Sequence, residues 1–293
     1  MLNLVFFKTV MVESLNLDQN DSSLAPTPIH QRTRVSNMFK SLGFLCLLTL
    51  ASQIYAKDCA MVLMHGKWAY PPPGKSLKEF SEVVGQACKI FTPNMPWSGS
   101  RNYDQTYENA LNEISKEVQS LRNTGYKRVI IAGQSFGANG AMAYQAYIGD
   151  ADAVIALAPG HVPSAFYDNG FTRSQVNKAR DLVKQGKPEE IISFTDINQG
   201  RRKSLEVRAD IFLSFFDPNS LANMSQSASS FKQSVPFLWV IGRQDRLYPE
   251  GSAYAFDKAP KHPKSNYLLI DAGHMDTSLK AAHEVLEWIR QLD

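Results

Sequence analysis

The feature that most constrains the fold is a short turn, Gly133-Gln134-Ser135-Phe136-Gly137, between a strand candidate and a helix candidate. Residues 128–132 before it form an apolar run typical of a strand, and residues 138–148 after it are expected to be helical. A serine on such a turn has an exposed hydroxyl, and the N–H of the next residue is free. Glycines two residues before and after it remove Cβ atoms that would collide. The turn therefore predicts a nucleophile, Ser135.

An acid and a histidine follow in positions that could serve this serine. The apolar run 235–241 predicts a buried strand, and Asp245 comes just after it. A second apolar run, 267–270, is followed closely by His274. In an open parallel sheet the loops beyond the carboxyl ends of the strands gather at one edge, so these residues can meet there. The hypothesis is that Ser135 is the nucleophile, His274 the general base and Asp245 the acid that orients the base.

These residues resemble the α/β-hydrolase superfamily, in which nucleophile, acid and histidine follow each other in this order. The resemblance covers nearly all of the chain from Cys59 onward and includes His65-Gly66-Lys67-Trp68, which follows another strand candidate. That segment is similar to the His-Gly turn of the superfamily. The resemblance implies an oxyanion hole made by the backbone N–H of Lys67, or of Trp68, together with that of Phe136. One such donor contributes about 3 kcal/mol to transition-state stabilisation.

Other residues near these positions are alternatives or possible neighbours of the substrate. Asp271 and Asp276 flank His274, but Asp271 precedes the turn that carries the histidine and Asp276 follows it closely, so neither easily reaches back to the ring. Asp245 is therefore the preferred acid. Aromatic residues on loops beyond the strand ends could line an apolar acyl pocket. These residues are Trp68, Tyr70 and Trp97. No metal site is expected, because neither cysteine after residue 56 has metal-ligand spacing.

The rest of the chain alternates between apolar runs and amphipathic segments. Further strands are expected at 60–64, 89–92 and 153–157, and helices at 76–87 with Ser76 as N-cap, at 104–122 and at 279–292. This alternation predicts an α/β fold with a mostly parallel central sheet and helices on both faces. Residues 161–235 exceed the length that one crossover helix needs. Helices are expected there at 172–186 and 200–216, and in the resembled fold such an insertion forms a lid over the site.

The first 56 residues have a different character. Residues 38–56 combine a basic start, an apolar stretch and a terminal small residue, Ala56, which is typical of a secretory signal peptide. Residues 1–37 would then be a disordered leader or a wrongly assigned start, and residues 57–293 the hydrolase domain. The prediction is an exported protein, periplasmic or secreted, with no membrane span in the mature form. Cys59 and Cys88 would then be a disulfide candidate, with two buried free thiols as the alternative.

Together these features predict a serine hydrolase that cleaves carboxylic esters through an acyl-enzyme and needs no cofactor. Its partner would be a small ester or acyl substrate. A thioesterase or peptidase of the same fold, and a non-catalytic binding protein that retains the fold, remain alternatives. The net charge of +3 is too small to indicate nucleic-acid binding, and no basic run with interleaved aromatic residues occurs.

Overall fold

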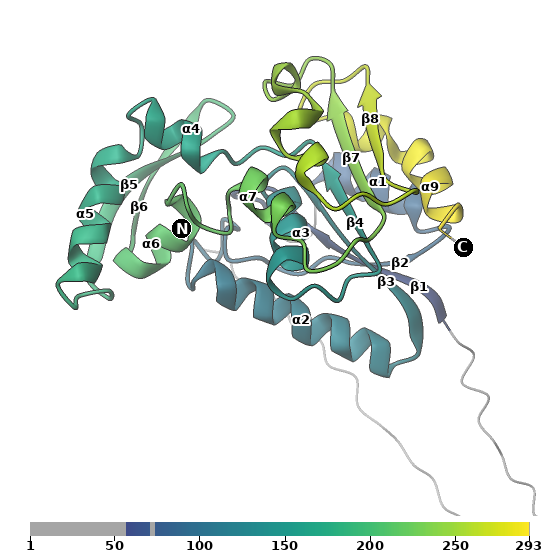
Figure 1. The fold of residues 1–293 in the computed structure, drawn as a ribbon, viewed down its shortest axis with the longest axis horizontal. Coiled ribbons are helices and arrows are strands. Elements are labelled where there is room, and N and C mark those ends of the chain that lie inside the picture. Colours follow the sequence, from purple (N-terminus) through teal and green to yellow (C-terminus); the bar gives the residue numbers. More distant parts are fainter. Residues whose placement is uncertain (1–56, 71–73, 293) are drawn as a thin grey trace, which may run out of the picture. The chain divides into compact units, whose positions relative to one another are not determined.

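A six-stranded parallel sheet forms the centre of the molecule (Figure 1). The computed structural model describes residues 57–70 and 74–292, so the predicted segments 1–37 and 38–56 lie outside the described residues. The strand order is β2-β1-β3-β4-β7-β8, and each neighbouring pair is parallel. The strands are β1 (Lys57–Met64), β2 (Lys89–Phe91), β3 (Tyr126–Gln134), β4 (Ala153–Leu157), β7 (Phe237–Gly242) and β8 (Asn266–Ile270). This sheet confirms the predicted fold class.

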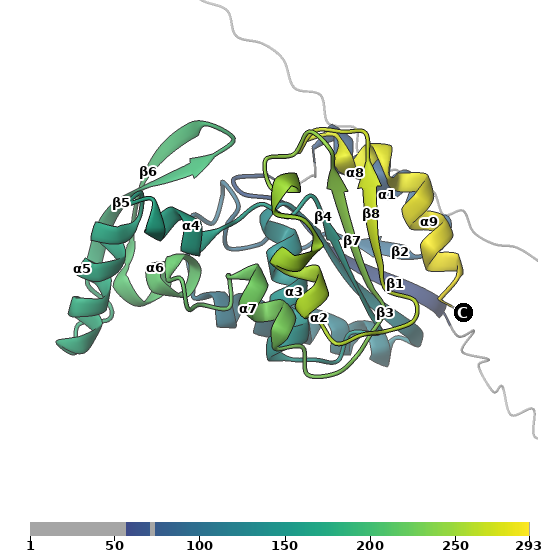
Figure 2. The ribbon, with the colours of Figure 1, turned by 45° about the horizontal axis from the view of Figure 1, so that its top comes forward.

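Helices cover both faces of this sheet, as Figures 1 and 2 show. One face carries α1 (Lys75–Val84), α8 (Thr277–Lys280) and α9 (Ala282–Arg290), and the other carries α2 (Tyr107–Asn123), α3 (Phe136–Tyr147) and α7 (Met224–Ser229). Because side chains alternate along a strand, β1 serves both layers. Met61 and Leu63 pack in the core with Phe80 of α1, while Val62 packs in the core with Ile114 of α2. Both cores are therefore built on strands that are apolar on both faces.

The first and the last helix of the domain differ from the sequence-based prediction. Ser76 is not the N-cap of α1, because the helix begins one residue before it and Gly74 occupies the cap position. The Ser76 hydroxyl is buried without a hydrogen-bond partner among the described residues. The single helix expected at 279–292 is two helices, α8 and α9. The segment between β7 and β8 also contains three short 3₁₀ helices, η1 (Tyr248–Glu250), η2 (Ser252–Tyr254) and η3 (Phe256–Lys258).

The insertion between β4 and β7 is not wholly helical. It contains α4 (Pro163–Asp168), α5 (Arg173–Lys184), β5 (Ile191–Asn198), β6 (Arg201–Arg208) and α6 (Ala209–Phe216) before α7. The helix expected at 200–216 is therefore wrong in its first half, where β6 pairs antiparallel with β5. Gln199 and Gly200 connect the two strands with φ angles of 48° and 79°, the positive values that a two-residue hairpin turn requires.

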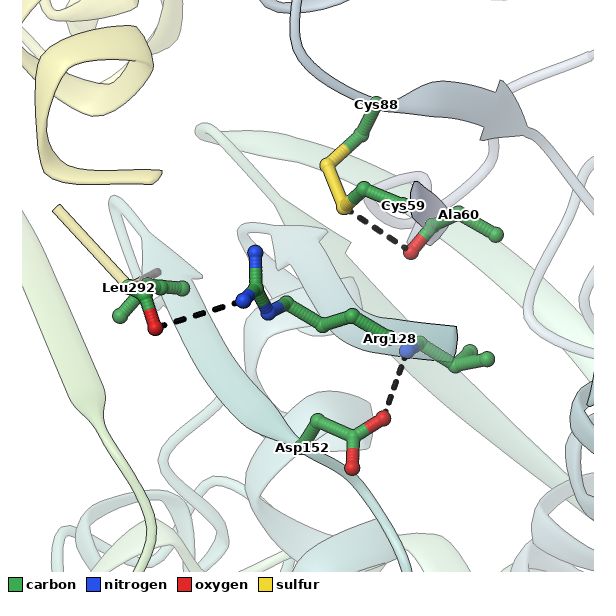
Figure 3. Close-up of a disulfide and its surroundings, with 7 residues drawn as sticks. Cys59, Ala60, Cys88, Arg128, Asp152 and Leu292 are labelled. Carbon is green, nitrogen blue, oxygen red and sulfur yellow. Dashed lines mark hydrogen bonds between the residues drawn. A yellow bond between two sulfur atoms is a disulfide. The ribbon is translucent and has the colours of Figure 1, made fainter. Parts of the chain in front are cut away.

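A disulfide joins Cys59 of β1 to Cys88, the residue before β2, across a Cα–Cα distance of 4.6 Å (Figure 3). Both side chains are buried. Cys59 lies near the amino end of β1, whereas the loops that carry Ser135, Asp245 and His274 follow the carboxyl ends of their strands. The disulfide is therefore part of the framework of the sheet and lies away from these three residues.

Within the described part of the chain, no helix combines the length and the apolar character that crossing a membrane requires.

Candidate active site

Ser135 lies alone between the end of β3 and the start of α3. Its φ and ψ angles are 55° and −118°, a conformation that L-amino acids seldom adopt. The turn is so tight that a Cβ atom on Gly133 would lie 2.1 Å from the carbonyl group of Gly137. A Cβ on Gly137 would lie 2.2 Å from the carbonyl oxygen of Met64. Glycine is therefore required at both positions, and the strained backbone holds the serine side chain at the carboxyl edge of the sheet.

Ser135, His274 and Asp245 form one hydrogen-bonded line. The distance from His274 Nε2 to Ser135 Oγ is 2.9 Å, and the distance from His274 Nδ1 to Asp245 Oδ2 is 2.7 Å. Because a carboxylate can only accept, Nδ1 of a neutral ring carries the proton, and Nε2 is then free to accept the serine proton. The Asp245 side chain is 3% exposed and that of His274 is 11% exposed, so the bond between them is shielded from water.

The expected acid, Asp245, is further held by its own loop, and the carboxylates of the two alternative acids have other hydrogen-bond partners. The second carboxylate oxygen of Asp245 accepts from the N–H of Leu247 at 2.9 Å. Asp271 accepts from the amide of Gln244, and Asp276 accepts from the N–H of Gly273 at 2.7 Å. Neither of these carboxylates hydrogen-bonds the His274 ring. Geometry therefore favours Asp245 as the acid.

The two amides expected to form an oxyanion hole belong to segments that adjoin the serine. Phe136 is the first residue of α3, so its N–H has no acceptor within the helix and lies at the positive end of the helix dipole. The turn that carries Lys67 passes close to Ser135, since a Cβ on Gly66 would lie 3.1 Å from the serine Cβ. The backbone N–H of Lys67 has no acceptor among the described residues, whereas that of the alternative donor, Trp68, donates to the carbonyl oxygen of Trp97 at 2.9 Å. Both amides can therefore donate to a ligand.

His65 shapes this turn with both of its ring nitrogens. Nδ1 lies 2.8 Å from the carbonyl oxygen of Gly66, and Nε2 accepts from the N–H of Met95 at 3.1 Å. The carbonyl oxygen of His65 accepts from the indole N–H of Trp97 at 2.7 Å. Burial lowers the pKa of His65, which keeps the ring neutral and able to donate and accept at once. The histidine is a structural part of the turn.

Two cavities meet at the serine, with volumes of about 520 Å³ and about 400 Å³. Ser135, His274 and Lys67 line both of them. The larger cavity extends between α1 and α8 and is lined by the apolar side chains of Leu77, Met275 and Leu279. The smaller cavity extends under α4 and is lined by aromatic and polar side chains, among them those of Phe136, His161, Phe166 and Tyr254. A molecule with two substituents on a central carbonyl carbon could place one in each cavity.

The three aromatic residues expected to line an acyl pocket do not line either cavity. Trp97 is wholly buried, because its ring packs 4.9 Å from the ring of Phe136 in the core. Trp68 donates its indole N–H to Asp196 at 3.1 Å. Tyr70 is 61% exposed. Loop position alone does not fix the direction of a side chain, and these side chains point to the core, to the insertion and to solvent.

Two residues close to this site carried little or no sequence signal. Gly160 follows β4, and a Cβ placed on it would lie 2.7 Å from Cε1 of His274 and 3.0 Å from Ser135 Oγ. Asp196 of β5 is fully buried and forms an ion pair with the Lys67 ammonium at 2.5 Å. The only hint of Asp196 in the sequence is its place two residues after Phe194 and four after Ile192, on the apolar side of an alternating strand.

Comparison with known proteins agrees with this architecture. A model of the alpha/beta hydrolase family matches residues 61–288. No curated protein matches the chain. Among solved structures, the monoacylglycerol lipase of Paleococcus ferrophilus is 18% identical, with 81% of this chain and 97% of that chain covered and a TM-score of 0.55. Est1E from Butyrivibrio proteoclasticus, solved with ferulic acid bound, is 16% identical, with 82% and 90% covered and a TM-score of 0.53. DcsB, in complex with its substrate analogue, is 15% identical, with 82% and 92% covered and a TM-score of 0.58. The chain belongs to the alpha/beta hydrolase family.

Proposed function

We propose that this hydrolase cleaves carboxylic esters with Ser135 as its nucleophile. The observation that carries the proposal is the hydrogen-bonded line from Ser135 through His274 to Asp245, at 2.9 and 2.7 Å. These distances are within the reach that proton transfer requires. The line begins at a strained serine next to a free helix N-terminus.

The proposed reaction has two halves. Ser135 Oγ bonds to the ester carbonyl carbon while its proton moves to His274 Nε2. The Lys67 and Phe136 amides stabilise the negative charge on the carbonyl oxygen. The bond to the alcohol oxygen then breaks, and the alcohol leaves with the proton from His274. Water attacks the acyl-enzyme in the same way, giving its proton to His274, and the acid is released as Oγ regains a proton.

Ester substrates are favoured by two observations. Of the solved structures with the same fold, one is a monoacylglycerol lipase and another, Est1E, holds ferulic acid. The apolar lining of the larger cavity suits a hydrocarbon acyl or alcohol group. A thioester or an amide would meet the same nucleophile, so a direct comparison of substrates is the deciding experiment.

The test is steady-state hydrolysis of p-nitrophenyl esters of increasing acyl length, beside a matched thioester and a matched anilide. The wild type should hydrolyse the ester fastest, and Ser135→Ala and His274→Gln should each lower kcat by about 10⁴ or more. Faster turnover of the thioester or anilide would replace the ester assignment. An inactive wild type would support the binding-protein alternative.

We also propose that the hydrolase is exported, with cleavage after Ala56. The disulfide between Cys59 and Cys88 supports an oxidising compartment, because such bonds persist there and are rare in reducing cytosol. Amino-terminal sequencing of the product from a bacterial host should give Lys57 as the first residue. A mature product that retains residues 1–56 would contradict the proposal.

A further inference from the structure

The insertion contributes one fully buried carboxylate, Asp196, on which three side-chain donors converge. The Lys67 ammonium lies 2.5 Å from Oδ1, the Tyr103 hydroxyl donates to Oδ2 at 2.7 Å, and the Trp68 indole N–H donates to Oδ2 at 3.1 Å. The backbone N–H of Ile197 donates to Oδ1 at 2.8 Å. Each oxygen of the carboxylate therefore has two donors.

The ion pair at the centre of this cluster is buried. The side chains of Lys67 and Asp196 are 5% and 1% exposed. The Lys67 ammonium also lies 5.1 Å from the ring centre of Phe216 and 5.7 Å from those of Phe136 and Phe166. A buried ion pair adds little to stability over an apolar pair of similar volume, so stability alone does not explain its presence.

The cluster includes two side chains of the turn that carries the candidate oxyanion donor. Lys67 and Trp68 are consecutive residues of that turn, and Trp68 has a φ angle of 57°, which a non-glycine residue seldom adopts. Asn198, the last residue of β5, contacts the main chain of the same turn. Its side-chain amide donates to the carbonyl oxygen of Lys67 at 3.0 Å. The hairpin thus fixes both the side chain and the backbone of Lys67.

We propose that Asp196 is a positioning residue for the oxyanion hole and that the β5–β6 hairpin holds the turn at Lys67 in place. This inference rests on the proposed function, since it assigns Asp196 a role in the same reaction. Asp196 reaches the reacting atoms only through Lys67 and Trp68. A donor that is held in place beforehand stabilises the transition state more than the ground state, so its displacement lowers kcat and leaves KM largely unchanged.

The test compares Asp196→Asn with wild type on a p-nitrophenyl ester, with kcat expressed per active site after titration with a fluorophosphonate. Loss of one oxyanion donor costs about 10²–10³ in rate, and a donor that is only misplaced should cost less, so kcat is expected to fall about 30- to 100-fold. KM should stay within about threefold of the wild-type value, since the carbonyl contacts form mainly in the transition state.

A second readout separates positioning from a merely structural role. An alkyl boronic acid forms a tetrahedral adduct on the serine and places an oxygen in the hole, so its Kd should rise by the same factor as kcat/KM falls. The matched control is Asp210→Asn in the same insertion, where the carboxylate pairs with Arg208 at 2.7 Å and lines neither cavity. Its kcat, KM and boronate affinity should equal those of wild type.

Each outcome bears on the inference. If kcat per active site and boronate affinity in Asp196→Asn match wild type while the melting temperature falls, Asp196 is only structural and the inference is wrong. If Asp196→Asn does not fold, Trp68→Phe removes one donor from the same carboxylate and should lower kcat about fivefold at unchanged KM, and a wild-type kcat would overturn the inference. A wild type that neither turns over ester nor reacts with the fluorophosphonate would instead refute the proposed function itself.

Discussion

The substitution Gly160→Ala should disable the hydrolase without unfolding it. A Cβ atom at this position would lie 2.7 Å from Cε1 and 3.2 Å from Nε2 of His274, and 3.0 Å from Ser135 Oγ. Ordinary carbon contacts need about 3.5 Å or more, so the imidazole must move by about 0.8 Å. The methyl group would stand beside the bond between the serine and the histidine, which is 2.9 Å long and would lengthen beyond hydrogen-bond range.

The expected loss follows from that displacement. A misplacement of about 1 Å costs about 10²-fold in rate, and a general base contributes about 10²–10⁴-fold. We therefore expect kcat/KM to fall by about 10²–10³, which corresponds to about 3–4 kcal/mol of lost transition-state stabilisation. Gly160 is exposed and its φ angle lies outside the left-handed region, so alanine fits the backbone. The free energy of unfolding should change by less than about 1 kcal/mol.

The assay is initial-rate hydrolysis of a p-nitrophenyl ester together with urea unfolding of each variant. Gly74→Ala is the matched control, because a Cβ there meets no atom of the described residues within 4 Å. It should keep kcat/KM within about twofold of wild type, since alanine adds no contact at that position. A Gly160→Ala variant with kcat/KM within threefold of wild type would refute the argument that the Ser135–His274 geometry governs the rate.

Three further predictions test other parts of the account. Asp245→Asn should lower kcat by about 10³–10⁴ with little change in KM, because an amide that donates to Nδ1 of His274 favours the wrong tautomer of the ring. A kcat above one tenth of the wild-type value in steady-state kinetics would contradict this. His161 is buried with a pKa well below its usual value, mainly through desolvation and then through the Lys67 charge. As the pH falls, the unfolded chain therefore takes up the proton before the folded chain does. Below about pH 6.5 the free energy of unfolding should fall by up to about 1.4 kcal/mol per pH unit. The fall should be shallower in His161→Gln. Urea unfolding at pH 7.5, 6.0 and 5.0 measures this, and identical slopes in the two proteins would contradict it. Replacing Cys59 and Cys88 by serine removes a link across a sequence separation of 29. The free energy of unfolding, measured in urea, should fall by about 3.5 kcal/mol, while kcat should be unchanged. A lower kcat per folded molecule would show that the disulfide affects the site.

Much of the site could be predicted because its residues follow strands that are apolar on both faces. In a parallel sheet the carboxyl ends of such strands meet at one edge, so the loop positions of Ser135, Asp245 and His274 were sufficient to bring them together. The glycines around Ser135 were also informative, since only a sharp turn needs glycine at those positions. Local sequence determined these features.

The insertion could not be predicted to the same extent. Charged residues at the start of β6 obscured its alternation, so half of the hairpin was expected to be helical. The role of Asp196 depends on partners that lie 129, 128 and 93 residues away in the sequence. The direction of Trp97 depends likewise on packing against α3 and α6. Tertiary contacts, which no local pattern encodes, determine these features.

The central claim is that Ser135 is an activated nucleophile, and covalent labelling tests it most directly. The protein is incubated with a fluorophosphonate, digested and mapped by mass spectrometry, with Ser135→Ala treated in parallel. The account predicts one phosphonyl adduct, on the peptide that contains Ser135, and none in Ser135→Ala. An adduct that persists in Ser135→Ala, or that maps to a different residue in wild type, would contradict it.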